Sequence, residues 1–345
     1  MSTFYDKELC KVETPQGTMT LTGVFLPFFL EMFLMNFMGT VNTFMLSWFS
    51  DGAVAAVGAA SQFAGMISTL YAVIGTGASI MISHNMGAGK KERASDAAFT
   101  ALLAGSLFSL LVSAVASACA EPLMALMHIE GAVLSDAASY FRICMRFSFL
   151  GAVFSIISAI FKSCGMPKIS VGVSLGTNVL NAFLNYLVIF HPGSFFAKGV
   201  RGIAWCNNIS RAAALAVMLL LLWKLPLGLS LRFRPKRCLR MILPVLKVGI
   251  PGAVSTLSYN ISQTVTTSII AMAGMSAISA KIYVSNLVFY VYVLGMSLGL
   301  STSLLIGWLS GAGRFEQAYR LNLQNLKVTL MLNSTLSILL FLFGT

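Results

Sequence analysis

The chain has 345 residues, of which 57% are hydrophobic and only 10% charged, and its mean hydropathy is +0.84. Soluble domains carry roughly a quarter charged residues, so this composition excludes a soluble domain and indicates an all-α, polytopic membrane protein. The net charge of +12 does not indicate a nucleic-acid partner, because most Lys and Arg gather in the N-terminal segment and in alternate connections. This asymmetry predicts a multi-pass protein of the inner cell membrane with a cytoplasmic N-terminus.

Nine apolar stretches are long enough to cross a membrane, since a helix needs about 20 residues to span about 30 Å of hydrocarbon. They are expected at 19–49, 54–84, 94–118, 134–164, 169–190, 203–223, 248–272, 277–308 and 322–343. A Pro- and Arg-rich segment after the sixth stretch is expected to be a cytoplasmic amphipathic linker on anionic lipid. We therefore divide the chain into a first lobe at 1–224, the linker at 225–247 and a second lobe at 248–345.

Residues 27–94 recur without a gap at 251–318, where 17 of the 68 positions are identical, including the triplet Gly87-Ala88-Gly89. Because six helices return the chain to the same face of the membrane, the two lobes are expected to be parallel repeats. The second copy contains counterparts of the first three helices only, against six in the first lobe. We expect a missing C-terminal segment or a second polypeptide to complete it.

Glu31 lies one turn beyond Pro27 inside the first apolar stretch. A carboxylate there costs about 3 kcal/mol on insertion scales, which favours a functional role over a purely apolar one. Glu31 is therefore a candidate for cation coupling through the gain and loss of a proton. Two structural roles compete with this one: the side chain lies near the cytoplasmic headgroups, or it pairs with Lys162 or Arg211.

Amide side chains form a second group of candidates for cation coupling. Asn181 and Asn185 share one face of the fifth helix because they are four residues apart. Together with Asn42 and Asn207 they are expected to converge in the first lobe, since an unpaired amide in hydrocarbon costs several kcal/mol. The competing role for each amide is to hold neighbouring helices together. The candidates for a substrate cavity are Asn207, Gln62, Asn260, Asn286 and Lys281.

Two arginines, Arg142 and Arg146, lie four residues apart in the outer half of the fourth stretch. Either they snorkel to the outer headgroups or they face an aqueous cavity. The six cysteines and three histidines are scattered along the chain and predict neither a disulfide nor a metal site.

Several segments resemble the multidrug and toxic compound extrusion (MATE) transporters. Residues 39–47, the AVAAVG run at 53–58 and GAGK at 87–90 resemble the N-terminal part of these transporters. Further matches are KSCGMPK at 162–168 and GVRGIA at 199–204. The resemblance implies an antiporter, driven by protons or sodium and without a cofactor, that exports amphipathic, often cationic organic compounds between two six-helix lobes. Family members usually carry Asp at the position of Asn42, and many carry Asp at that of Asn185, so this chain has an amide cluster where carboxylates are expected.

Three other functions were weighed against this one. A lipid-linked saccharide flippase of the same superfamily would need a cationic cavity, for which Arg142, Arg146 and Lys281 are the candidates. An incomplete fragment without transport activity is a second alternative. An intramembrane enzyme would need paired carboxylates or a nucleophile beside a base, and this sequence has neither pattern, so we predict no catalytic residue.

Overall fold

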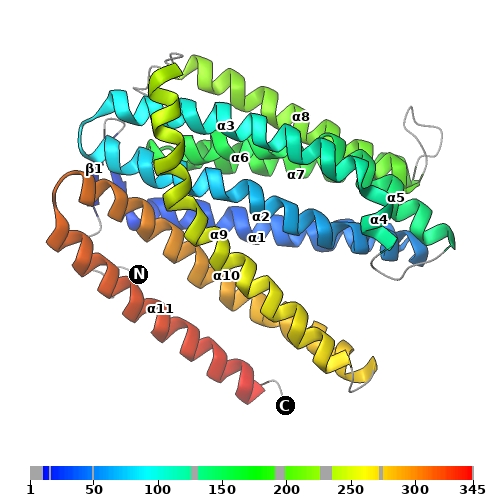
Figure 1. Cartoon of the computed structure of the whole chain (residues 1–345). Coiled ribbons are helices and arrows are strands. Elements are labelled where there is room, and N and C mark those ends of the chain that lie inside the picture. The colour runs from blue at the N-terminus through cyan, green and yellow to red at the C-terminus, as the bar shows by residue number, and fades with distance from the viewer. Residues whose placement is uncertain are drawn as a thin grey trace.

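The computed structural model describes residues 11–14, 17–48, 50–125, 131–190, 199–225, 235–271 and 275–343. These residues form long helices preceded by one short β-hairpin (Figure 1). The all-α, polytopic fold class is therefore confirmed.

The hairpin was not expected from the sequence. Strands β1 (Lys11–Thr14) and β2 (Gly17–Thr20) pair antiparallel, with Val12 opposite Met19. Both of these side chains are buried in a hydrophobic cluster that includes residues of both lobes. The hairpin therefore packs against the bundle as part of its core.

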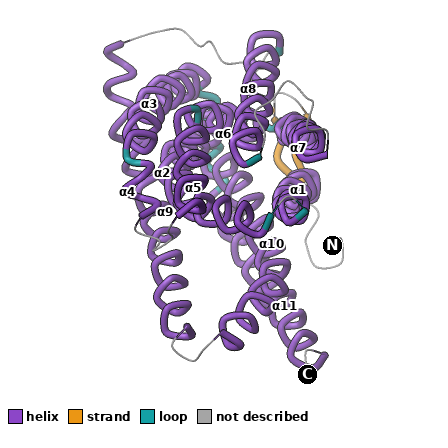
Figure 2. The backbone as a smooth tube through the Cα atoms, turned by 90° about the vertical axis from the view of Figure 1, so that its right-hand side faces the viewer, coloured by secondary structure: helices purple, strands orange, loops and turns teal. Residues whose placement is uncertain are grey.

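The first lobe contains all six expected membrane helices. Its elements are α1 (Leu21–Ser47), α2 (Asp51–Gly87), α3 (Lys91–Ala118), the short α4 (Ala120–Ala125), α5 (Gly131–Arg146), α6 (Ser148–Ser163), α7 (Pro167–Phe190) and α8 (Val200–Lys224). Viewed along these helices, α1, α7 and α8 form one side of the lobe (Figure 2).

The fourth expected helix is divided in two. Helices α5 and α6 meet at Phe147 with a bend of 46°. A break exposes carbonyl groups that lack an intrahelical donor. Here Ser113 of α3 donates to the carbonyl of Met145, and Asn208 of α8 donates to that of Ile143 at 2.9 Å. Side chains of neighbouring helices therefore stabilise the bend.

The second lobe contains α9 (Pro235–Ala271), α10 (Met275–Gly311) and α11 (Phe315–Phe343). Residues 235–247 of the expected linker are helical and belong to α9, whereas residues 226–234 lie outside the described residues. Proline is tolerated in the first turn of a helix, so Pro235 can begin α9. The helix continues past Pro244 and Pro251 and packs along α2 and α3.

Within the described residues, seven helices are long and apolar enough to cross a membrane, or eight if the bent pair α5 and α6 forms one span. Nine were expected. The ninth expected stretch, 322–343, lies in helix α11, whose last side chains are only partly described and which this count does not include.

The lobes meet through α2, which packs against α9 and α10. At one end of the bundle, a Cβ atom on Gly87 would collide with the carbonyl oxygen of Trp308, and one on Gly311 would collide with that of His84. Both pairs are related by the offset that relates the two copies in the sequence. Toward their other end, α9 and α10 diverge from α1 and α2 (Figure 1).

The two glycines of the repeated Gly-Ala-Gly triplet have different structural roles. The first glycine of each copy allows the close contact between α2 and α10. The last glycine, Gly89 or Gly313, has a positive φ of 70° or 77° and turns the chain into the next helix. The triplet therefore joins a turn to an interface between the lobes.

We predict that Gly87→Ala lowers the stability of the purified protein in detergent by about 1 to 3 kcal/mol, because the added methyl group must displace backbone of α10. Thermal unfolding measures the effect. Gly65→Ala is the matched control, since Gly65 lies in the same helix and has open space around its Cβ position. Equal stability of the two variants would show that α2 and α10 do not depend on this contact.

Candidate cation and substrate sites

Four asparagines from three helices form a hydrogen-bonded amide cluster, which consists of Asn42 in α1, Asn181 and Asn185 in α7, and Asn207 in α8. Asn42 Nδ2 donates to Asn181 Oδ1 at 3.2 Å, and Asn185 Nδ2 lies 3.2 Å from both Asn42 Oδ1 and Asn181 Oδ1. Asn181 Nδ2 donates to Asn207 Oδ1 at 2.8 Å. The predicted convergence of these four side chains is confirmed.

The cluster lies inside the lobe, where polar groups need partners. Asn181 and Asn185 are only 8% and 2% exposed, and Asn42 and Asn207 are half-buried. The spacing of four residues places both α7 asparagines on the face that packs against α1 and α8. The four-residue spacing of these asparagines in the sequence therefore correctly predicted that they share one face of α7.

Tyr140 of α5 extends the cluster and was missed by the sequence analysis. Asn207 Nδ2 donates to its hydroxyl oxygen at 2.9 Å, and the tyrosine is buried. No motif surrounds Tyr140, so only the packing of α5 against α8 brings it to the amides.

One acceptor in the cluster has no donor. Asn185 Oδ1 is buried and accepts no hydrogen bond from any residue that the structure describes. A buried acceptor without a partner costs about 1 to 3 kcal/mol. Amide oxygens are suitable ligands for hard cations, so this atom is a place where a small cation or a water molecule can bind.

Glu31 lies outside the amide cluster. Its Oε2 is 2.7 Å from Lys162 Nζ of α6, and Ser174 of α7 donates to Oε1 at 3.3 Å. The side chains of Glu31 and Lys162 are 18% and 16% exposed, and the ammonium group also lies 4.9 Å from the ring centre of Phe28. Of the two structural roles considered for Glu31, pairing with Lys162 is therefore observed, and a role in coupling stays a prediction.

Two of the remaining cavity candidates, Gln62 and Asn260, lie on helices that do not contribute to the amide cluster. Gln62 is exposed on α2, and Asn260 is half-buried on α9. The side chains of Asn286 and Lys281 lie outside the described residues.

Aromatic side chains lie together on α9 and α10 of the second lobe. Tyr259 and Tyr292 stack with ring centres 6.2 Å apart, and Phe289 lies 6.2 Å from Tyr292. The tyrosines are 52% and 43% exposed, so their rings are accessible. Such faces attract organic cations through their π-electrons.

The described residues contain no group of three His, Cys, Asp or Glu side chains arranged to hold a metal ion. In the turn between α6 and α7, burial raises the pKa of the Cys164 thiol to about 12, so this cysteine stays protonated at neutral pH.

Comparisons with known proteins agree on one family. The family model described as MatE matches residues 27–187 and 251–345. The uncharacterized transporter YisQ of Bacillus subtilis (strain 168) is 33% identical over 331 residues, which cover 95% of this chain and 72% of that protein. The probable multidrug resistance protein NorM of Thermotoga maritima is 25% identical over 343 residues, with coverage of 97% and 72%.

Solved structures show the same fold. A crystal structure of MATE in complex with MaD3S superimposes with a TM-score of 0.85 at 21% identity, covering 94% of this chain and 73% of that one. An outward-facing multidrug resistance MATE family transporter of the MOP superfamily also gives a TM-score of 0.85 at 21% identity, with coverage of 94% and 72%.

We predict that Asn181→Ala lowers stability in detergent by about 1 to 2 kcal/mol, because this residue takes part in three of the hydrogen bonds of the cluster. The matched control is Asn178→Ala, a half-buried asparagine of α7 for which the described part of the chain gives no side-chain hydrogen bond. The two variants are compared by thermal unfolding. A loss no larger than that of the control would contradict a stabilising network.

Proposed function

The chain belongs to the MatE family of multidrug efflux transporters, and on this basis we propose that it exports amphipathic, cationic organic compounds in exchange for protons or sodium ions. The sequence resemblance to this family is thereby confirmed, and the protein is an integral membrane transporter. The observation that carries the proposal of cation coupling is the buried amide cluster with its unpaired oxygen, Asn185 Oδ1.

In the first lobe, sodium and protons would bind at different groups: sodium at the amide cluster and a proton at Glu31. Amides do not titrate near neutral pH, so the cluster supports binding of sodium through its oxygen atoms. Protonation of Glu31 would leave Lys162 without its counter-ion. A proton-driven cycle therefore requires the pair of Glu31 and Lys162 to separate.

The substrate is proposed to contact the exposed aromatic side chains of the second lobe. Stacked tyrosine rings favour flat or cationic organic molecules over anions. Among the cavity candidates, Gln62 and Asn260 remain proposals for polar contacts with the substrate, as do Asn286 and Lys281.

The proposed orientation follows from the basic residues. We place the N-terminus in the cytoplasm of a cell with an inner membrane, so the end at which α2 contacts α10 is cytoplasmic. The two lobes then separate toward the outside. The second lobe contains counterparts of three of the first lobe's six helices, and we propose that a further segment or a second polypeptide packs on α10 and α11 during transport.

A flippase for lipid-linked saccharides is less well supported. Arg142 and Arg146 line a groove formed by α5 and the last residues of α3, both helices of the first lobe, so the groove does not lie between the lobes. A cationic cavity between the lobes would then depend on Lys281, whose side chain lies outside the described residues.

We predict that vesicles containing the protein release a cationic dye when a proton or sodium gradient is imposed, and that Glu31→Gln abolishes the proton-driven release. The substitution keeps the size of the side chain and removes its titration. Glu316→Gln is the control, since Glu316 forms an exposed ion pair with Arg320 at 2.7 Å. Dye release that ignores both gradients would exclude the antiporter.

The same dye-release assay distinguishes between protons and sodium as the coupling ion. If Glu31→Gln vesicles transport normally from pH 6 to pH 8, Glu31 does not carry the proton. Sodium-driven release should then be lost in Asn185→Leu, which removes the unpaired oxygen.

We also predict that Tyr292→Ala weakens binding of a cationic dye about two- to thirtyfold, because a cation over an aromatic ring contributes about 0.5 to 2 kcal/mol. Fluorescence titration of the purified protein measures this change. Tyr319→Ala is the control, since Tyr319 is an exposed tyrosine on α11 outside the stack. Equal affinity of both variants would remove the aromatic stack from the substrate site.

A further inference from the structure

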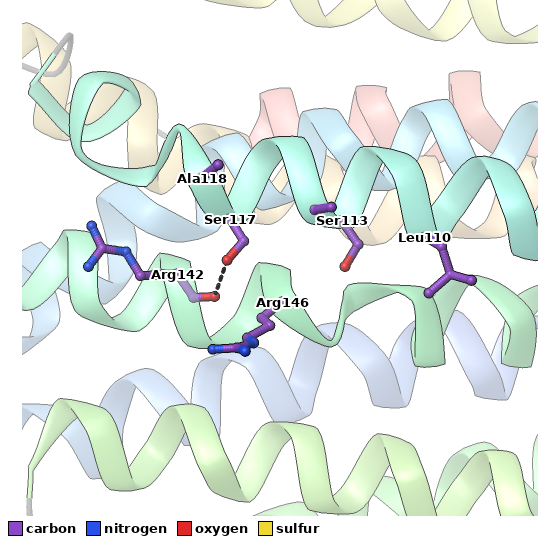
Figure 3. Close-up of a pocket in the computed structure, with 7 residues that line it drawn as sticks. Leu110, Ser113, Ser117, Ala118, Arg142 and Arg146 are labelled. Atoms are coloured by element: carbon purple, nitrogen blue, oxygen red, sulfur yellow. Dashed lines mark hydrogen bonds between the residues drawn. The ribbon is translucent and has the colours of Figure 1, made fainter.

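A groove that contains two serines and two arginines lies between α3 and α5, on a part of the first lobe that the proposed transport cycle does not use. Its volume is about 560 Å³. The residues that line it are Leu110, Ser113, Ala114, Ser117, Ala118, Arg142 and Arg146. Figure 3 shows both arginines on α5 below the serines of α3.

Hydrogen bonds fix the depth of the groove along the helices. Ser117, next to the last residue of α3, donates to the carbonyl of Arg142 at 3.2 Å. Arg142 is therefore level with the end of α3, and Arg146 lies about 6 Å closer to the middle of the bundle. The basic end of the groove is thus near the end of α3, one of the helices long and apolar enough to cross a membrane.

The charge of the groove is incompletely balanced. Arg142 forms a 2.8 Å ion pair with Glu121, and both side chains are largely exposed. Arg146 has neither an ion pair nor a side-chain hydrogen bond among the described residues, although it lies at the bend inside the pair α5 and α6, which together are long enough to form one span. A guanidinium group at this depth needs an anion or water, and its planar fork suits a phosphate group.

The rim of the groove is apolar. Leu107, Leu111 and Val115 are all exposed and share one face of α3, because they are spaced four residues apart. This face continues from the serines toward the middle of the membrane. An acyl chain can lie along it while a headgroup lies beside the arginines.

From these contacts we propose that the groove binds one anionic phospholipid, with its phosphate group at Arg146 and Arg142 and an acyl chain along Leu107 and Leu111. Ser117 completes the phosphate contacts as a donor that exchanges its bond to the carbonyl of Arg142. The arginines then bind a lipid at the rim of the lobe rather than a substrate between the lobes. This site is independent of transport.

Native mass spectrometry of the detergent-purified protein with equal amounts of phosphatidylglycerol and phosphatidylcholine tests the proposal. We expect one phosphatidylglycerol molecule to be retained in preference to phosphatidylcholine. Arg146→Gln should reduce that retention about tenfold or more, since a hydrogen bond to a charged group contributes about 1.5 to 3 kcal/mol. Equal retention of both lipids by the unmodified chain would overturn the proposal.

Three further measurements make the result specific. Arg201→Gln is the matched control, because Arg201 is an exposed arginine at the start of α8 outside the groove; an equal loss in this variant would refute the site. Arg146→Lys keeps the charge and should restore most of the retention, which separates binding from misfolding. Displacement of the lipid by millimolar glycerol phosphate would show that the groove takes soluble phosphate, and would overturn the assignment to a lipid.

Discussion

The close approach of α2 to α10 is the constraint on which the arrangement of the two lobes depends. Two helices can touch through their backbones only where a Cβ atom is missing, and Gly87 and Gly311 meet this condition on opposite sides of the contact. Beside them, the buried Trp308 donates from Nε1 to the carbonyl of Ser163 at 2.9 Å, which ties α10 to the end of α6. Because both copies contribute the same glycine, the contact follows the symmetry of the repeat.

Polar groups inside the first lobe are satisfied in two different ways. In the amide cluster, neutral groups pair with one another across α1, α7 and α8, and one oxygen remains without a donor. Nearer the start of α1, Glu31 forms an ion pair with Lys162 of α6, so that each charge compensates the other. The neutral cluster can accept a cation without first losing a partner, whereas the ion pair must open before it can exchange a proton. The two sites therefore differ in the conformational change that ion binding demands.

The sequence predicted those features that depend on local spacing. Hydropathy located nine helical stretches, and the four-residue spacing of Asn181 and Asn185 indicated a shared face. The bend at Phe147 could not be predicted, because its donors, Ser113 and Asn208, come from other helices. The start of α9 was missed for a related reason: the linker composition suggested a surface segment, but packing along α2 and α3 extends the helix. Tyr140 reaches the amides only through the packing of α5 on α8.

The two copies differ at the polar positions that carry the candidate cation sites of the first lobe. The residue that corresponds to Asn42 is Thr266, whose hydroxyl donates to the carbonyl of Ser262 at 2.8 Å in its own helix. Glu31 corresponds to Ser255, which is exposed on α9. The second copy thus makes neither contact of the first, and its accessible rings lie on α9 and α10 instead. If ions bind in the first lobe and substrate in the second, their coupling passes through the contacts between the lobes, which α1, α2 and α3 make with α9 and α10.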